Sequence, residues 1–380
     1  MTLGLFFSRG VSLKLWLEKG LFEREKLLYE EHIKQNNIST VYWFTYGHND
    51  EKIAQELKKN NQLSNDIEII SMPQIFILPK IGSYIYSILL PFVQKKYINK
   101  CDIYKTNQTD GSWSAVIAKK LYKRKLLYRT GFTISQLENK LLRFNILLRK
   151  SIEMCEYFAY NYCDKAVVSS QHNLVYVTQK YDVKQENISV IYNFIDRKQF
   201  YDFQKTRENT VVFVGRLSDE KNIFNLISAL NKVGLALKIY GSGPLKSELE
   251  DFINKYNFNV QLMGNISNDK LPEVLNKCKY FTLVSKHEGM PKSLIEGMAC
   301  ACICIGTNVS GINEVIVNNN GILADDITVD TITEAFEKAQ AMSDSEVDEI
   351  MKNTQLFIDK SFTLDNIVEK EKSIFKDLLS

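Results

Sequence analysis

The sequence predicts an α/β protein with two Rossmann-like domains, each built on a parallel sheet. The chain has 380 residues. A single hydrophobic core stops growing at roughly 250–300 residues, so this length indicates two domains. Short β-branched and aromatic runs alternate with segments of helical periodicity, as expected for parallel strands covered by helices. The pattern restarts after a polar segment at 197–209. We expect a first domain at 1–195, a second at 196–362, and a C-terminal helix at 363–380 that packs back on the first.

A series of short apolar runs has the composition of buried strands. Periodic segments such as 13–35 and 135–160 lie between them and supply the covering helices, and a last helix with a polar face is expected after Thr363 or Asp365. The expected strands are 3–8, 40–45, 67–70, 102–105, 126–129 and 166–169 in the first domain, and 210–215, 236–240, 260–263, 280–285 and 302–306 in the second.

The bulk composition is typical of a globular cytoplasmic protein. Hydrophobic residues make up 45% and charged residues 24% of the chain, which are ordinary values. No apolar run approaches the roughly 18 residues of a membrane span, and the first residues lack the basic start of a signal peptide. Seven cysteines, an odd number without a disulfide-like framework, indicate a reducing compartment.

Three of the cysteines, Cys300, Cys302 and Cys304, would share one face of a strand. A metal site would need further ligands at suitable spacing, and neither a CxxC pair nor a histidine pair accompanies them. We therefore expect buried free thiols at these positions and no metal site.

The nearest approach to a membrane segment is IGSYIYSILLPFV at 81–93, which Pro91 interrupts and which Lys95 and Lys96 follow. Two interpretations fit this composition: a helix of the hydrophobic core, or a helix that lies in a membrane interface. We favour the core helix.

Charge is unevenly distributed, although the net charge is only +3. Residues 1–195 contain 27 Lys and Arg against 18 Asp and Glu, whereas 196–380 contain 21 against 27, and the basic excess is concentrated in 101–150. A basic half suits a polyanion or an anionic membrane, and an ordinary solvated surface is the alternative. Nucleic acid is disfavoured, because no RNP, KH or helix-turn-helix signature is present.

The stretch FVGRLSDEKN (213–222) places two cations, Arg216 and Lys221, directly after a strand that ends at Gly215. A helix is expected to begin near Glu220 or Lys221. In doubly wound folds, ligands bind at this edge of the sheet, and Arg and Lys both suit phosphate. Two ordinary surface cations are the alternative.

The stretch IYGSGP (239–244) leads from a strand into a turn that contains Gly241 and Gly243, and a helix is expected from about Leu245. Glycines allow close backbone approach to a ligand, and the helix N-terminus favours negative charge. The full GxGxxG pattern is absent, and no acid follows a strand at the expected distance, so a nicotinamide cofactor is disfavoured. A plain turn is the alternative.

The stretch KHEGMPKSLIEGMACACICIG (286–306) carries Glu288 before a Gly-Met-Pro bend and Glu296 on the helix expected at 292–299. The first N–H groups of this helix, from Lys292 to Leu294, would form an anion site. The two carboxylates would contact different parts of one elongated ligand with hydroxyls and phosphates, such as a nucleotide sugar. The alternative is a buried glutamate satisfied by the backbone and an exposed one on a loop.

These motifs resemble those of retaining glycosyltransferases with the GT-B fold, in the large family four, also called glycosyl transferases group 1. They occur in the order and spacing of that family, together with SGINEVI (310–316), and NFID (193–196) is similar to its hinge Asn-Gly-Val-Asp. The likeness is specific over about 165–320, whereas the N-terminal half matches only in layout. It implies two Rossmann-like domains whose parallel sheets face each other across a cleft.

The resemblance also implies roles for individual residues. Arg216 and Lys221 would neutralise the donor pyrophosphate and the departing diphosphate, Glu288 would contact hydroxyls of the donor sugar, and Glu296 would bind the ribose. The other expected donor contacts are Gly215, Gly241 and Gly243 along the nucleotide, Gly264 and Ile266 near the base, Gly289, Met290 and Pro291 at the sugar, and Ser293 and Leu294 at the phosphates.

The chain departs from the family pattern at several places. Met290-Pro291 stands where Phe or Tyr, then Gly or Pro, is frequent. The stretch LLYRTGF (126–132) has Arg129 where many members carry a histidine, and this arginine would bind an anionic acceptor or pair with an acid. The N-terminal loop lacks the glycine pair of the family. The expected acceptor-side residues are Gly10, Ser12, Arg129 and Thr130.

The same resemblance implies that a hexose-type sugar moves, with retained configuration, from a nucleoside diphosphate sugar such as a UDP-sugar to a saccharide or lipid-linked saccharide in cell-surface polysaccharide synthesis. No cofactor and no metal would be required, because two cations take the metal's place. The basic segment 101–150 suggests peripheral contact with an anionic inner membrane face. The alternatives are a GT-B nucleotide-sugar 2-epimerase and a non-catalytic GT-B partner subunit.

Overall fold

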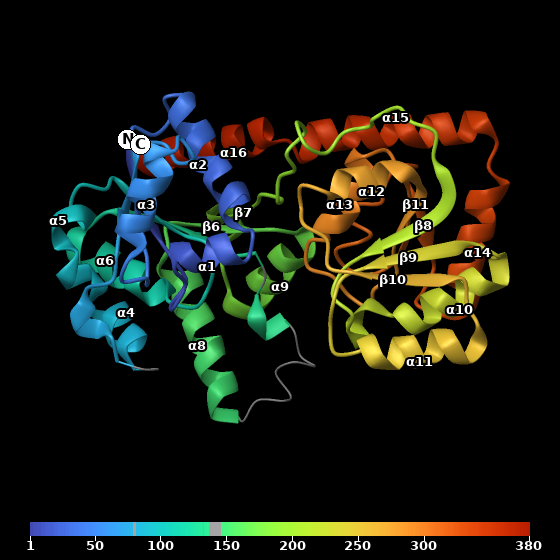
Figure 1. Cartoon of the computed structure of the whole chain (residues 1–380). Helices are drawn as coiled ribbons and strands as arrows, with labels where there is room; N and C mark the ends of the chain where they lie inside the picture. The colour runs from blue at the N-terminus through green and yellow to red at the C-terminus, as the bar shows by residue number, and fades with distance from the viewer. Residues whose placement is uncertain (79–80, 132, 137–145) are drawn as a thin grey trace. The chain divides into compact units, whose positions relative to one another are not determined.

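The structure is a computed structural model that describes every residue except 79–80, 132 and 137–145 (Figure 1). The chain forms two compact units. The first comprises Met1–Ile191 and Ile367–Ser380, and the second comprises Tyr192–Asn366. The chain therefore leaves the first unit after Ile191 and returns to it after Asn366, whereas the boundaries drawn from the sequence lie after residues 195 and 362.

The first unit contains a seven-stranded sheet in which all neighbouring strands are parallel, in the order β3-β2-β1-β4-β5-β6-β7. The six strands expected here are confirmed with small shifts at their ends, and the three-residue strand β7 is an addition. The strands are β1 (Thr2–Phe6), β2 (Thr40–Phe44), β3 (Ile67–Ile70), β4 (Ile103–Thr106), β5 (Lys125–Arg129), β6 (Lys165–Val168) and β7 (Ile188–Val190).

Parallel neighbours need crossover connections, and the helices of the first unit lie in them. Part of the expected helical segment 135–160 lies outside the described residues. The helices are α1 (Leu13–Glu18), α2 (Phe22–Lys34), α3 (Asp50–Lys59), α4 (Gly82–Val93), α5 (Lys95–Ile98), α6 (Ser112–Tyr122), α8 (Ile146–Tyr162) and α9 (Gln171–Tyr181), with single 3₁₀ turns at η1 (Gln74–Phe76), η2 (Ile134–Gln136) and η3 (Gln185–Asn187).

The C-terminal helix α16 (Leu364–Leu379) is anchored in the first unit by a buried ionic cluster. Glu371 on α16 is fully buried and accepts two hydrogen bonds from the Nζ of Lys105, at 2.7 and 2.8 Å. The Nε2 of His32 on α2 lies 3.2 Å from the Oε2 of the same carboxylate, and the His32 ring packs against Phe375. Charged and apolar contacts thus fasten the end of the chain to α2 and β4.

The second unit contains a six-stranded parallel sheet in the order β10-β9-β8-β11-β12-β13. The five expected strands are confirmed, and β13 is an addition. The strands are β8 (Glu208–Val214), β9 (Ala236–Tyr240), β10 (Val260–Gly264), β11 (Cys278–Leu283), β12 (Ile303–Thr307) and β13 (Ile322–Ala324); the helices are α10 (Ile223–Val233), α11 (Lys246–Tyr256), α12 (Leu271–Lys277), α13 (Lys292–Ala299), α14 (Val329–Ala341) and α15 (Asp344–Ser361).

The apolar segment 81–93 forms α4, but the expectation that it is a core helix is wrong. Tyr86, Ser87 and Leu90 are buried, whereas most of the large apolar side chains on α4 are exposed. The helix has apolar residues on both faces, so its composition resembles that of a core helix. The fold covers only one of these faces. Among the residues that the structure describes, none of the helices has the length and apolarity needed to cross a bilayer.

The cysteines of 300–304 are buried free thiols, as expected, but they do not share a strand. Cys300 follows the last turn of α13, Cys302 precedes β12, and only Cys304 lies within that strand. The chain turns between helix and strand at Ala301, whose φ is +59°. Burial raises the pKa of the Cys302 thiol to about 12, so this thiol stays protonated and inert at neutral pH.

Candidate functional site

The candidate site of the second unit lies at the carboxyl edge of its sheet. Because all neighbouring strands are parallel, the loops that follow β8, β9, β10, β11 and β12 all emerge at this edge. The strand order runs outward in opposite directions from β8 and β11, so the loops after these two strands flank the topological switch point, where doubly wound folds bind ligands. Arg216 and Lys221 follow β8, and Glu288 follows β11.

The loop after β8 differs from the expectation in its local structure. The helix does not begin at Glu220 or Lys221; a 3₁₀ turn, η4 (Asp219–Lys221), comes first, and α10 begins at Ile223. Asn222 between them has a φ of +55°, a left-handed conformation that asparagine tolerates. The turn brings the side chain of Lys221 back toward the sheet edge, while the side chain of Arg216 is exposed.

Glu288 and Lys221 form an ion pair through the Oε1 of Glu288 and the Nζ of Lys221. Their side chains are 13% and 18% exposed, so the pair is largely shielded yet reachable from solvent. The hydroxyl of Ser285 donates to the same carboxylate oxygen at 2.6 Å. The N–H of Glu288 donates to the carbonyl of Ser310 at 3.1 Å. Lys221 and Ser285 therefore hold the carboxylate of Glu288, and Ser310 holds its backbone.

Ser285 is a residue that the sequence reasoning missed. It is fully buried at the end of the chain that leaves β11, and its own carbonyl accepts a hydrogen bond from the hydroxyl of Thr307 at 2.7 Å. Gly311 was also missed: a Cβ at this position would lie 2.6 Å from the carbonyl oxygen of Glu288. The quoted motif at 310–316 was the available signal, because it follows β12 at the same edge.

The helix after the bend, α13, begins at Lys292, as expected, with Pro291 as its N-terminal cap residue. The N–H of Leu294 donates to the carbonyl of Pro291 at 3.1 Å, so it is already engaged in this structure. Glu296 is 4% exposed and pairs with Lys292 at 3.1 Å. The two glutamates thus lie in different surroundings, one after β11 and one on α13.

Gly241 and Gly243 are required by the packing between loops. A Cβ at Gly241, whose φ is +144°, would lie 1.8 Å from the carbonyl oxygen of Gly215, and a Cβ at Gly243 would lie 2.2 Å from that of Leu217. The N–H of Gly241 also donates to Gly264 at 2.8 Å. The loops after β8, β9 and β10 therefore touch through their backbones. Of the other expected donor contacts, Ile266 follows β10, Gly289 and Met290 lie between β11 and α13, and Ser293 is in the first turn of α13.

A second ion pair ties the loops after β8 and β11 together. The Nζ of Lys286 lies 2.8 Å from both carboxylate oxygens of Asp219, and the N–H of Lys286 donates to the carbonyl of Glu220 at 2.8 Å. Within the described part of the chain, no three His, Cys, Asp or Glu side chains gather as a metal site would require.

The expected acceptor-side residues lie in the first unit, at the carboxyl edge of its own sheet. Gly10 has a φ of +75°, and the hydroxyl of Ser12 caps α1 by accepting from the N–H of Leu15 at 3.0 Å. Arg129 is the last residue of β5, and Thr130 is buried behind it, with its N–H donating to Val167 at 3.0 Å.

The same edge carries an arginine that the sequence reasoning missed, Arg9, directly before Gly10. Arg9 follows β1 and forms two parallel hydrogen bonds with the carboxylate of Asp110, at 2.9 and 3.0 Å. Asp110 follows β4, so the pair bridges the switch point of the first sheet. The guanidinium also lies 3.6 Å from the ring centre of Tyr84 on α4. The signal was available, since Arg9 comes directly after a predicted strand.

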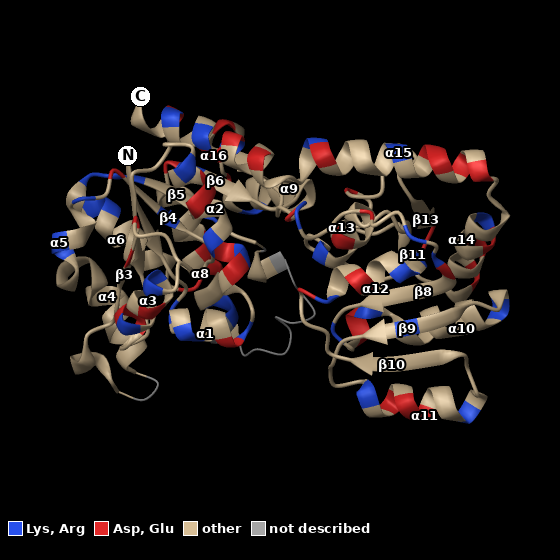
Figure 2. Ribbon diagram, turned by 45° about the horizontal axis from the view of Figure 1, so that its top comes forward, with Lys and Arg blue, Asp and Glu red and all other residues tan. Residues whose placement is uncertain are grey.

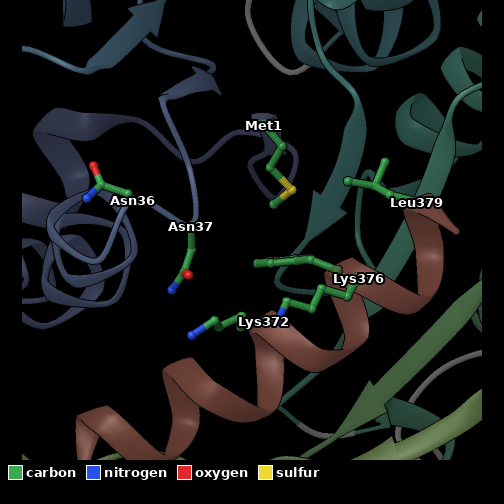
Figure 3. Close-up of a pocket in the computed structure, with 7 residues that line it drawn as sticks. Met1, Asn36, Asn37, Lys372, Lys376 and Leu379 are labelled. Carbon is green, nitrogen blue, oxygen red and sulfur yellow. The ribbon is translucent and has the colours of Figure 1, made fainter.

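A pocket of about 210 Å³ lies elsewhere on the first unit (Figure 3). Met1, Asn36 and Asn37 form one side and residues of α16 form the other, including Lys372 and Lys376. Met1 precedes β1, so this pocket lies at the amino edge of the sheet, away from the loops that carry the expected site residues. None of those residues lines it.

Residues 195–358, which carry every expected donor contact, match the family described as Glycosyl transferases group 1. This part of the chain is a group 1 glycosyltransferase domain. The resemblance of the motifs to the glycosyl transferases group 1 is thereby confirmed.

Solved glycosyltransferases of the GT-B fold match the whole chain. A glycosyltransferase from Rickettsia africae has a TM-score of 0.73 at 18% identity and covers 100% of this chain and 99% of its own. HepE from Anabaena, in complex with UDP and glucose, has a TM-score of 0.74 at 16% identity and covers 99% and 100%. At these identities the likeness shows the fold, which is GT-B, as predicted.

Two curated relatives match part of the chain. An uncharacterised glycosyltransferase from Methanocaldococcus jannaschii is 26% identical over 238 residues, 61% of this chain and 66% of its own length. An N-acetylgalactosaminyltransferase from Campylobacter jejuni, whose name gives a diphospho-undecaprenol-linked sugar as its acceptor, is 30% identical over 210 residues, 52% of this chain and 55% of its own. The alignments span about half to two thirds of the length of these relatives.

Proposed function

We propose that the chain is a retaining glycosyltransferase that moves a hexose-type sugar from a nucleoside diphosphate sugar to a saccharide or lipid-linked saccharide. The observation that supports this most is the Lys221–Glu288 pair at the switch point of a group 1 glycosyltransferase domain. A cation for the diphosphate and a carboxylate for the sugar are held there side by side. The UDP and glucose bound to HepE support the same donor class.

The donor would replace the ion pair by new contacts. Lys221 and the exposed Arg216 would face the diphosphate, whose negative charge grows as the sugar leaves, so both cations would stabilise the transition state more than the ground state. The N–H groups of Lys292 and Ser293 would add the positive end of α13 to this field. Glu288, released from Lys221 but still bonded to Ser285, would accept hydrogen bonds from the sugar hydroxyls.

The remaining expected contacts complete the donor assignment. Glu296 would bind the ribose, and the backbone at Gly264 and Ile266 would lie beside the base. We expect no metal requirement, because Arg216 and Lys221 supply the positive charge that a divalent cation gives other transferases. Retention of the anomeric configuration rests on the resemblance of the motifs.

The acceptor would bind to the loops of the first unit around Gly10, Ser12, Arg129 and Thr130. The name of the Campylobacter jejuni relative supports a lipid-linked saccharide as one acceptor class. The bidentate Arg9–Asp110 pair presents further polar groups at this edge. Sugar synthesis for the cell surface would place such an acceptor at the inner membrane face.

Screening nucleoside diphosphate sugars for thermal stabilisation is the first test of this proposal. A ligand that binds only the folded chain raises Tm in proportion to the logarithm of its concentration, so one sugar nucleotide should raise Tm more than its free nucleoside diphosphate. NMR of the product formed with a saccharide acceptor should then show a retained anomer.

Two alternative functions make different predictions in the same experiment. A 2-epimerase would convert the donor without any acceptor, and a non-catalytic subunit would bind the donor but transfer nothing. An inverted product anomer would contradict the retaining mechanism while leaving the donor site intact.

Ser285→Ala is expected to lower kcat/KM about 10-fold with the donor that the screen identifies. A hydrogen bond to a charged group contributes about 1.5–3 kcal/mol, and the hydrogen bond from the N–H of Glu288 to the carbonyl of Ser310 still holds the backbone of Glu288 when the hydroxyl is removed. The donor dissociation constant should change much less than kcat, because Ser285 positions Glu288 and is itself covered by protein.

Thr282→Val is the matched control for this substitution. Thr282 is a fully buried residue of β11, and its hydroxyl donates to the carbonyl of Ile305 at 3.2 Å, away from Glu288. It should cost stability but leave kcat/KM nearly unchanged. If both variants lost the same amount of kcat/KM, Ser285 would have only a structural role.

A further inference from the structure

The first unit presents an unusually apolar surface on α4 and the segment before it. We call this surface the apolar stripe. Its members are exposed large apolar residues: for example, Ile75 is 80% exposed and Phe92 is 54% exposed. Isolated exposed apolar residues are ordinary, but a contiguous set marks a site of interaction. The apolar stripe consists of Ile75, Ile77, Leu78, Ile81, Tyr84, Ile85, Ile88, Leu89, Phe92 and Val93.

The positions on α4 recur every three or four residues, so they form one continuous face of the helix. The opposite face packs against α6. There the Nε1 of Trp113 donates to the hydroxyl of Ser87 at 2.9 Å, and the hydroxyl of Tyr122 donates to the carbonyl of Pro91 at 2.8 Å. Bonds on the inner face fix the helix, and the apolar face points outward from the first unit.

The chain segments around the apolar stripe carry basic but no acidic residues, and Asp110, which lies near Tyr84 of the stripe, is paired with Arg9. No Asp or Glu occurs between Glu68 and Asp102, or between Asp110 and Glu138. Figure 2 shows the ribbon of α4 without acidic or basic residues, beside the basic α5. Exposed cations of the described residues near α4 include Lys95, Lys96 and Lys100, on and after α5. Lys123 and Arg124 follow α6, and the Nη2 of Arg124 donates to the carbonyl of Asn99 at 3.3 Å.

We propose that the apolar stripe docks onto an anionic membrane surface. The apolar side chains would enter the boundary between headgroups and acyl chains, and the flanking lysines and arginine would meet anionic headgroups. A second copy of the chain fits this surface poorly, because a two-fold contact through the apolar stripe would bring the same cations of both copies together. Docking of this kind does not depend on the proposed transfer reaction.

The position of the apolar stripe suits an enzyme with a lipid-linked acceptor, and this refinement does rest on the proposed function. Tyr84 belongs to the apolar stripe, and its ring lies under the guanidinium of Arg9. Arg9 lies in the loop after β1 that also carries Gly10 and Ser12. A membrane contacted by the apolar stripe would therefore lie next to the expected acceptor-side loops. The sugar of a lipid-linked acceptor could reach those loops while its lipid stays in the bilayer.

The test is flotation of the full chain with phospholipid vesicles, without any substrate. At low salt, vesicles of phosphatidylcholine with phosphatidylglycerol should carry the protein to the top of the gradient, and vesicles of phosphatidylcholine alone should carry much less. The I88Q/F92Q variant should lower the partition coefficient by at least about 10-fold, because two large apolar side chains no longer enter the interface. The K95Q/K96Q variant should bind weakly and lose most of its dependence on salt.

The V175Q/L356Q variant is the matched control, since both of these apolar side chains are exposed and neither belongs to the apolar stripe. It should float like the unchanged protein. Loss of flotation in this control equal to that of I88Q/F92Q, or no flotation of the unchanged protein at low salt, would overturn the proposal. So would a dimer, seen by light scattering, that I88Q/F92Q dissociates while flotation is unaffected. Circular dichroism spectra should show that each variant is folded.

Discussion

Lys221→Ala is expected to lower turnover by roughly 10²–10³-fold, the usual loss when one preorganised electrostatic partner of a transition state is removed. Lys221 is held at the switch point by its own ion pair with Glu288, so it need not be recruited when the donor binds. The loss should appear mainly in kcat, because the charge on the diphosphate grows during the reaction and is smaller in the bound donor. Initial rates at saturating donor measure it directly.

Arg216→Ala should show a loss of the same size, because its exposed guanidinium follows the same strand as Lys221 and faces the same diphosphate in the proposed donor complex. Lys232→Ala is the matched control. Lys232 also lies in the second unit, where it pairs with Asp330 at 2.7 Å on the exposed surface of α10 and α14. Its removal changes the net charge equally but should leave turnover within about two-fold, since exposed ion pairs contribute little. Near-normal turnover in both site variants would refute the assignment of the diphosphate site.

The contact between Lys221 and Glu288 makes a sharper prediction about the pair. Residues in direct contact show non-additive effects, whereas distant residues add. The double variant Lys221→Ala with Glu288→Gln should therefore lose less activity than the product of the two single losses. Strict additivity would mean that the two side chains act on separate steps, and the ion pair of the ligand-free structure would then have no part in the reaction.

The sheets could be predicted from the sequence because parallel strands leave a strong local signal. They are buried on both faces and therefore form continuous apolar runs, and eleven of these were recognised. The strands β7 and β13 were not, because three residues such as those at 322–324 are too short to separate from a loop. The segment 81–93 shows the other limit: composition reveals that a helix is apolar, but only the fold decides which of its faces is covered.

The candidate site was predictable in its residue types and less so in its contacts. Arg216, Lys221 and Glu288 stand out because each follows a predicted strand, and parallel topology then brings them to one edge. Ser285 could not be found in this way, because its hydrogen bond to Glu288 depends on how the chain bends after β11. The buried partners of Glu371 were equally hidden, since Lys105 and Glu371 are separated by most of the chain and the sequence contains no sign of their pairing.

The buried Lys105–Glu371 ion pair leads to a prediction of a large loss of stability. Glu371→Gln is expected to destabilise the first unit by about 3–5 kcal/mol, the usual consequence of leaving one charge of a buried ion pair without its partner. Lys105 would remain fully buried and bonded only to a neutral amide. Tryptophan fluorescence in a urea titration measures the effect on the right unit, because Trp16, Trp43 and Trp113 all lie in it.

Glu369→Gln is the control on the same helix. Glu369 pairs with Lys372 at 2.8 Å, but its side chain is 60% exposed, so its removal should cost less than about 0.5 kcal/mol. The double variant K105M/E371Q should recover much of the loss, because the buried cation is gone and the glutamine still offers a hydrogen-bond partner to His32. If Glu371→Gln were no more harmful than Glu369→Gln, the buried cluster would not hold α16 in place.

The effect should also depend on pH in a definite direction. Burial alone would raise the pKa of the Glu371 carboxyl, but the charge of Lys105, together with the hydrogen bond and charge of His32, holds this pKa well below its usual range. A carboxyl whose pKa is lower in the folded state stabilises that state above its unfolded pKa of about 4.3, and the contribution is lost as pH falls below that value. The difference in urea midpoint between the unchanged protein and Glu371→Gln should therefore be present at neutral pH, well above the unfolded pKa of the carboxyl. It should shrink as the solution is acidified below about pH 4, whereas the Glu369→Gln difference should stay small throughout.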